Sequence, residues 1–201
     1  MRARWNGYAA ALLLTACGNG GSDNAMAGNI AAAALPATAP AAATAVAAAA
    51  PAAGRVSRFS KLTEANCPIK ETIEETGDWV RTCPGVAGFT LEWSTSDLRD
   101  DLDVIAGGKS HSLNFPSLVG NGAFNSLGET LEWRGPEGRA PDVLVARVQV
   151  SGPDGKLDSG RLAIARLGPA PCLVAIVPPG AAQSDRARVI ADGKLPACLK
   201  D

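Results

Sequence analysis

Hydrophobic and polar residues alternate in short stretches along most of the chain after residue 60, separated by Gly, Pro, Asn and Asp. A period of two is typical of strands that bury one face, and short polar connections are typical of hairpins. Because almost every connection is short, we expect the strands to pair in antiparallel fashion. The predicted strands are Ile69–Ile73, Trp79–Thr82, Phe89–Trp93, Leu102–Ala106, Thr130–Arg134, Val143–Val150, Arg161–Leu167 and Leu173–Val177.

One segment near the end of the chain, Ala181 to Asp192, has a helical pattern, and Gly193 after it is a common helix C-terminal residue. We expect this helix to cover one face of the sheet. The side expected to face the sheet carries Ala182, Ala187, Val189 and Ile190. The predicted fold class is therefore α+β: a mostly antiparallel β-sheet with one C-terminal α-helix packed on it, braced by two disulfides.

The two disulfides are predicted from four cysteines that follow residue 60. Cys67 lies nine residues before the turn Thr76-Gly77-Asp78 and Cys83 five residues after it, so that strand pairing would bring them together. Cys198, just beyond the helix, could return to Cys172 at the start of the last strand. Four cysteines allow three connectivities, so the spacing favours this pairing without excluding the others.

The N-terminus has the order of a secretory signal, because Arg2 and Arg4 precede an apolar run from Tyr8 to Ala16. A membrane-spanning helix needs roughly 20 apolar residues, about twice what this run provides. Its end, Leu14-Thr15-Ala16-Cys17, resembles the lipobox of bacterial lipoproteins, in which the cysteine is lipidated before cleavage. The resemblance predicts a signal peptide over residues 1–16 and lipidation of Cys17; the alternative is an ordinary signal peptide whose cysteine joins a disulfide.

The number of cysteines supports lipidation independently. An exported chain with five cysteines has one thiol left over after pairing, and lipidation of Cys17 removes it. Because Gly18 and not Asp follows Cys17, the resemblance implies the outer membrane of a Gram-negative envelope, with the domain facing the periplasm.

The segment from residue 17 to residue 54 is expected to be a disordered tether. It has no charged residue between Asp23 and Arg55, it is mostly alanine, and Pro36, Pro40 and Pro51 interrupt it. The pieces between prolines are too short for stable isolated helices. Charges and aromatic residues begin at Arg55, so we predict one β-rich globular domain over residues 55–201.

The charge of this domain is nearly balanced. Residues 55–201 hold 17 Lys and Arg (19 in the chain less Arg2 and Arg4) against 19 Asp and Glu (20 less Asp23), a net charge of −2. This balance, without a Lys/Arg cluster, argues against nucleic acid as a partner.

Few residues are suited to catalysis or metal binding. His111 lies between two serines in an expected Gly-rich loop from Gly107 to Gly122, without the sequence motif of a serine hydrolase. Gly120 and Gly122 lack the third glycine of a dinucleotide site. We therefore predict no catalytic residue of these classes and no cofactor.

Calcium is considered because aspartates crowd one turn, but Ile105 stands where an EF-hand loop needs an oxygen ligand and Arg99 lies inside the cluster. Zinc is disfavoured because the cysteines are expected to be oxidised. We predict no metal site. The aspartates in question are Asp97, Asp100, Asp101 and Asp103.

A pair of glutamates is the remaining chemical candidate. Thr90-Leu91-Glu92-Trp93 recurs as Thr130-Leu131-Glu132-Trp133, which we interpret as two strands with Leu and Trp inward and Thr and Glu outward. If the strands lay side by side, Glu92 and Glu132 could hydrolyse a glycoside.

Several segments together look like a group of small exported proteobacterial proteins whose function is uncharacterised. The similarity spans nearly the whole domain, and it assigns no role to any residue. The segments are Asn66-Cys67, residues 77–85, Asp97-Leu98-Arg99, residues 127–134, Cys172-Leu173-Val174 and residues 187–192.

The leading hypothesis is a non-catalytic envelope lipoprotein whose domain binds another envelope component, protein or glycan; an inhibitor of a lysozyme or protease is one version. The first alternative is a cell-wall hydrolase that uses Glu92 and Glu132. The second is a structural lipoprotein that tethers or assembles other envelope proteins.

The lipid anchor leads to a prediction about Cys17. Cys17→Ser should release a soluble, still folded domain, because the lipid attachment atom is lost while the other four cysteines remain. Membrane fractionation with circular dichroism checks both parts. A variant that stays in the membrane fraction and is processed like wild type would contradict the anchor.

Overall fold

The computed structural model describes residues 54–200, all of which fall in the same structural unit. The predicted signal peptide, Cys17 and the tether up to residue 53 lie outside these residues. In the described range, no helix is long and apolar enough to cross a membrane. The elements are β1 (Arg55–Lys61), β2 (Ile69–Ile73), β3 (Asp78–Pro84), β4 (Thr90–Ser96), β5 (Arg99–Ala106), β6 (Lys109–Ser112), α1 (Phe115–Leu118), β7 (Asn125–Pro136), β8 (Val143–Ser151), β9 (Leu157–Arg166), β10 (Cys172–Val177) and α2 (Gln183–Asp192).

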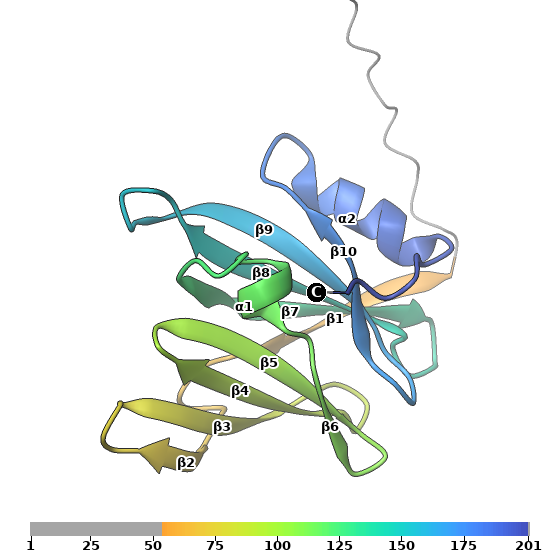
Figure 1. Cartoon of the computed structure of the whole chain (residues 1–201). Coiled ribbons are helices and arrows are strands. Elements are labelled where there is room, and N and C mark those ends of the chain that lie inside the picture. Colours follow the sequence, from red (N-terminus) through yellow and green to blue (C-terminus); the bar gives the residue numbers. More distant parts are fainter. Residues whose placement is uncertain (1–53, 201) are drawn as a thin grey trace, which may run out of the picture. The chain divides into compact units, whose positions relative to one another are not determined.

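The strands form one sheet in the order β10-β9-β8-β7-β5-β4-β3-β2, with β1 added to β7 and β6 added to β5. All extended pairings are antiparallel, which confirms the predicted fold class. The exception is a single parallel contact, Arg99 with Asn125, where β5 meets β7. This contact joins two halves, β2–β6 and β1 with β7–β10 (Figure 1).

The two halves pack face to face around the main core. Leu91 and Leu102 come from β4 and β5, whereas Leu131, Trp133 and Leu144 come from β7 and β8, and all five are fully buried in one cluster. Successive residues of a strand point to opposite faces, so the residues of one strand that face this core lie at every second position. Leu91 and Leu131 point inward as expected; Trp133 is fully buried, and Trp93 is partly buried against the same core.

A third layer is formed by α2, which covers the other face of β8, β9 and β10 (Figure 1). Ala187 and Ala191 are buried against Val143 and Ile164, and Ile190 packs beside them. The prediction was wrong for Val189, which is 43% exposed. It was also wrong for Ala182, which is exposed and precedes the first residue of α2. Successive helical residues are rotated by about 100°, which carries Val189 away from the side that holds Ala187, Ile190 and Ala191.

Two strands are not predicted by the hydrophobic pattern. β1 carries Arg55, Arg58 and Lys61, and β6 has the polar sequence Lys-Ser-His-Ser. The expectation of a Gly-rich loop from Gly107 to Gly122 was therefore wrong. This segment contains β6 and α1 and is fixed to the core by apolar residues that the glycines and serines conceal: Leu113, Phe115 and Val119.

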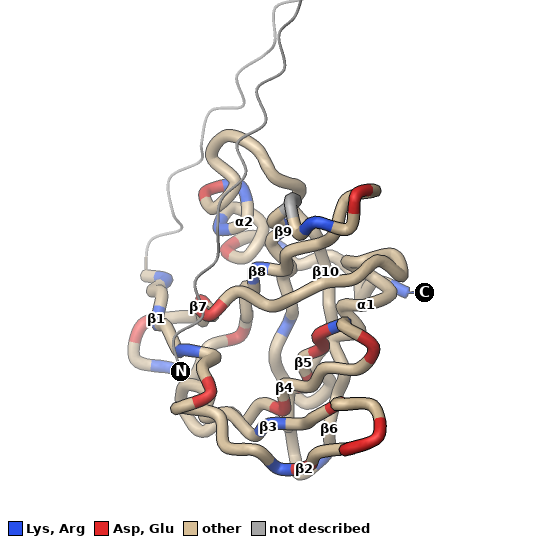
Figure 2. The backbone as a smooth tube through the Cα atoms, turned by 90° about the vertical axis from the view of Figure 1, so that its left-hand side faces the viewer, with Lys and Arg blue, Asp and Glu red and all other residues tan. Residues whose placement is uncertain are grey.

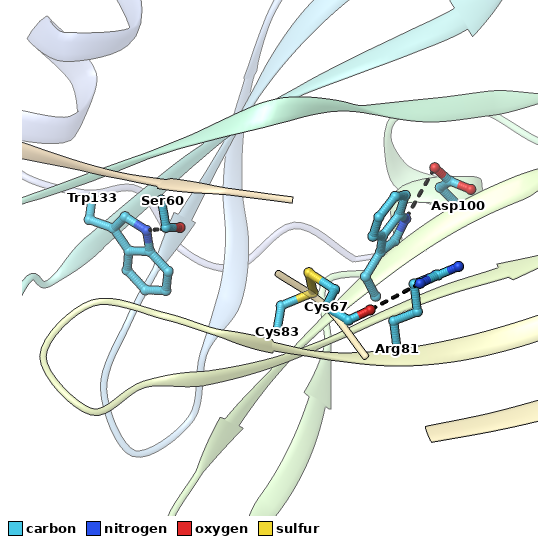
Figure 3. The surroundings of a disulfide bond; sticks show 7 residues. Ser60, Cys67, Arg81, Cys83, Asp100 and Trp133 are labelled. Atoms are coloured by element: carbon cyan, nitrogen blue, oxygen red, sulfur yellow. Dashed lines mark hydrogen bonds between the residues drawn. A yellow bond between two sulfur atoms is a disulfide. The ribbon is translucent and has the colours of Figure 1, made fainter. Parts of the chain in front are cut away.

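Both predicted disulfides are present, Cys67–Cys83 and Cys172–Cys198. Figure 3 shows the first, which is fully buried and joins the loop before β2 to β3. Arg81 of β3 donates a hydrogen bond of 3.0 Å to the carbonyl oxygen of Cys67. The beginning of β2 is thus held to β3 by a covalent bond and a charge-assisted hydrogen bond.

Each disulfide should contribute measurably to stability. The bridges span sequence separations of 16 and 26 residues, and closing loops of this size restricts the unfolded chain by about 3 kcal/mol. We expect the pair Cys67→Ala/Cys83→Ala and the pair Cys172→Ala/Cys198→Ala each to lower the free energy of unfolding by about that amount in guanidinium titrations. Unchanged midpoints under non-reducing conditions would contradict this.

Candidate functional site

Glu132, one of the two candidate glutamates, lies on the face of β7 that points toward α2. Its Oε1 accepts hydrogen bonds from Ser57 Oγ at 2.6 Å, Arg188 Nε at 2.9 Å and Arg134 Nη1 at 3.3 Å. Burial alone would raise the pKa of Glu132, but the bonds from Arg188, Ser57 and Arg134 outweigh it and lower the pKa. Glu132 is therefore held as a carboxylate.

The same guanidinium groups belong to a larger ion-pair network. Asp192 at the end of α2 accepts bonds from Arg134 Nε at 2.8 Å, Arg134 Nη2 at 2.6 Å and Arg55 Nε at 3.0 Å. Arg55 also pairs with Asp142. The side chains of Arg134 and Asp192 are only 4% and 6% exposed. We call the following set the Arg134 network: Arg55, Ser57, Glu132, Arg134, Asp142, Arg188 and Asp192.

Glu92, the second candidate glutamate, lies far from this network in the fold. Its strand β4 pairs with β3 and β5, and Glu92 forms an ion pair with Lys70 Nζ at 2.6 Å. Glu92 and Glu132 both point away from the main core, but from opposite layers of it, since their neighbours Leu91 and Leu131 point inward. The structure therefore does not bring the two carboxylates together.

The four aspartates considered for calcium do not converge on one point, although Asp101 and Asp103 share a face of β5. Asp97 lies in the β4–β5 turn and pairs with Arg99. Asp101 and Asp103 accept hydrogen bonds from Ser112 and Ser110, at 2.6 Å and 2.5 Å. Asp100 points the other way, into the core. Within residues 54–200, no group of three or more His, Cys, Asp and Glu side chains could hold a metal ion.

Asp100 has a structural position at the junction of the two halves. Its carboxylate accepts from the backbone N–H of Leu127 at 2.9 Å and from Trp93 Nε1 at 3.2 Å, and its carbonyl oxygen accepts from Asn125 at 2.7 Å. Burial raises the pKa of Asp100, opposed by the bonds from Leu127 and Trp93. The alternation Asp100, Leu102, Val104 is the sequence signal that places this aspartate on the buried face.

His111 lies on β6, opposite Val104. The hydroxyl groups of Ser110 and Ser112 donate to Asp103 and Asp101, so neither neighbouring serine donates to His111. The arrangement is that of a short edge strand and not of a serine–histidine pair.

A shallow hollow of about 170 Å³ lies over β2, β3 and β4. The residues that line it combine apolar, hydroxyl and carboxylate groups. Ile69 and Ile73 of β2 are 49% and 46% exposed, Ile73 at the hollow itself. We call it the β2–β3 hollow; its lining includes Glu71, Ile73, Asp78, Trp79, Val80 and Ser94.

The hydrophobic pattern does not predict this hollow, because single exposed isoleucines in a strand pattern are indistinguishable from core residues until the edge of the sheet is known. Register provides the signal. Glu71 lies opposite Val80, and Val80 opposite Ser94, so these three share one face.

Comparison with protein-family models, with curated protein sequences and with solved structures gives no match. The function is therefore inferred from the residues of the domain itself.

The Arg134 network predicts a strong effect at Asp192. Asp192→Asn should lower the free energy of unfolding by about 3 kcal/mol, because Arg134 is left buried beside an uncharged partner. Asp185→Asn, which removes a 60% exposed carboxylate from the same helix, is the control and should change stability by less than about 0.5 kcal/mol. Equal effects of the two substitutions would contradict a stabilising network.

The difference in stability between wild type and Asp192→Asn should depend on pH. Burial would raise the pKa of Asp192, but Arg134 and Arg55 outweigh it and lower the pKa. An acid with a lowered pKa stabilises the fold above its ordinary pKa, about 4, and loses this contribution as pH falls through the lowered value. The stability difference between wild type and Asp192→Asn should therefore shrink below about pH 4. Asp100 is present in both proteins and cancels in the difference.

Proposed function

We propose that this chain is a lipid-anchored envelope lipoprotein whose β-rich domain binds another envelope component, protein or glycan, without catalysing a reaction. Lipidation of Cys17 would hold the chain on the outer membrane, and the tether would let the domain reach its partner in the periplasm.

The observation that carries the non-catalytic part is the state of the candidate carboxylates. A glycosidase needs one carboxylic acid with a raised pKa to protonate the leaving group. The pKa of Glu132 is lowered by Arg188, Ser57 and Arg134, and Glu92 is ion-paired with Lys70. Glu132 is thus held ionised and immobilised, and Glu92 is held by its ion pair with Lys70; both arrangements suit structural roles.

The binding part is supported by the β2–β3 hollow, where half-exposed Ile73 lies beside carboxylates. Apolar groups ringed by polar ones are typical of interaction surfaces. The segment 107–122 gives little support to the inhibitor version of the hypothesis. Phe115 and Val119 pack this segment against the core, so it is not a projecting inhibitory loop. The β2–β3 end, with its exposed isoleucines, offers the apolar surface for an inhibitory contact.

Envelope crosslinking with mass spectrometry tests this proposal. We expect the wild-type chain to crosslink to a defined envelope protein or to cell-wall glycan, and Cys17→Ser to lose most of that product because it leaves the membrane. Purified cell wall supplies the opposing test. Hydrolysis by the wild-type chain that disappears in Glu92→Gln or Glu132→Gln would favour the hydrolase instead.

A further inference from the structure

The domain has two distinct ends. The tether joins at β1, whose first residue Arg55 is bound to Asp192 of α2 by the Arg134 network. The hairpin β2–β3 lies at the other end, away from α2, in both views of the molecule (Figures 1 and 2). With the proposed lipid anchor on the tether, the β2–β3 end is the part of the domain free to face away from the membrane.

We propose that β2 is a docking edge, to which an extended cationic segment of another envelope protein adds as a further strand. The inference deepens the proposed function, on which it rests for the orientation of the domain, and it names the chemistry of the partner.

The backbone of β2 supports strand addition. β2 stands at the end of the pairing order and is hydrogen-bonded to β3, and among residues 54–200 no strand pairs with its other side. All five of its residues are exposed. An uncovered edge presents backbone N–H and C=O groups that an extended chain can satisfy.

The charge around β2 selects a cationic partner. Residues 69–78 contain four carboxylates and one ammonium group, Lys70, which is already paired with Glu92. Hydrogen bonding with Thr76, the backbone of Asp97 and Ser96 lowers the pKa of Asp78 and keeps it ionised. The four carboxylates are Glu71, Glu74, Glu75 and Asp78; Figure 2 shows red positions at this end of the tube.

Apolar contacts add to the charge. Ile69 and Ile73 are about half exposed, and Ile73 borders the hollow that Val80 also lines. Side chains on one face of an added strand would lie beside Glu71 and Ile73. A Lys or Arg opposite Glu71, followed two residues later by a β-branched residue opposite Ile73, therefore fits this edge.

The start of this edge is fixed to β3 before a partner binds. The buried Cys67–Cys83 disulfide and the Arg81 hydrogen bond fix the start of β2 to β3 (Figure 3). A partner that adds to a preorganised strand loses less conformational entropy at the interface.

Two other occupants fit less well. A second copy paired antiparallel through β2 would place Glu71 near Glu71, and like charges opposite each other are destabilising. The chain's own tether has no Lys or Arg between residues 24 and 54, so it offers no complementary charge.

The test uses the full chain and a synthetic peptide of about ten residues, the length of a long strand, in which Lys and Val alternate along one face and Thr occupies the other face. Two matched peptides serve as controls, one with Glu in place of Lys and one with Pro in place of every second Val. We expect the Lys/Val peptide to slow hydrogen exchange in β2 and β3, and calorimetry to show at least about tenfold weaker binding of either control.

A charge-reversed variant supplies the second arm. Glu71→Lys/Glu74→Lys should weaken binding of the Lys/Val peptide by about tenfold or more. Glu137→Lys reverses an exposed carboxylate in the β7–β8 turn and should leave binding unchanged. Circular dichroism checks that both variants remain folded.

Several results would overturn the docking edge. These are equal binding of the Pro peptide, slowed exchange outside β2 and β3, protection of β2 by peptidoglycan fragments instead of the cationic peptide, or dimerisation through β2 in sedimentation experiments. If a cellular partner crosslinks but the peptide does not protect β2, the proposed function is supported and the docking edge is contradicted. If the peptide protects β2 but no envelope component crosslinks, the docking edge is supported and the proposed function is contradicted.

Discussion

The paired hydrogen bonds between Arg134 and Asp192 connect elements that are far apart in the sequence. Arg134 lies on β7, between β1 and β8, whereas Asp192 ends α2 and Arg55 begins β1. Buried ions are stable only when they are paired and their hydrogen bonds are satisfied, so these three groups require each other. The entry point of the tether, the position of the helix and the central strand β7 are thereby fixed relative to one another.

The two ends of the domain also differ in how their charges are paired. Glu132 and Asp192 at the α2 end are paired within the domain, whereas Glu71, Glu74 and Glu75 of the β2–β3 hairpin are exposed. Lys70, the one basic residue among residues 69–78, is paired with Glu92. The ion pairs of Glu132 and the surface of the hairpin therefore have different physical roles, although both involve acidic side chains. A partner gains most where charge and apolar surface remain unsatisfied, and for this reason the proposed binding function and the docking edge belong to the same end of the domain.

Strand alternation predicts the fold class and cysteine spacing favours both disulfides, because a period of two, and cysteines on the two sides of one turn or near one helix, are local signals. β1 and β6 escaped prediction because their partners, β7 and β5, allow charged and hydroxyl side chains on the outer faces. Glu92 and Glu132 lie in the same four-residue sequence but have different neighbours in space. Their strands, β4 and β7, are kept apart by β5, which lies between them in the sheet. The β2–β3 hollow depends on which strand is at the edge, which is a property of topology and not of local sequence.

The bond from Arg55 to Asp192 and the disulfide at Cys198 also bear on how the chain folds. The first joins residues 137 positions apart, and the second closes on a cysteine almost at the end of the chain. A ribosome releases the N-terminus first, and contacts of such long range form late because the loop between them must close. β1 therefore cannot take its final place until α2 has been synthesised, so the ion pair that fixes the first strand is also one of the last contacts that folding can complete.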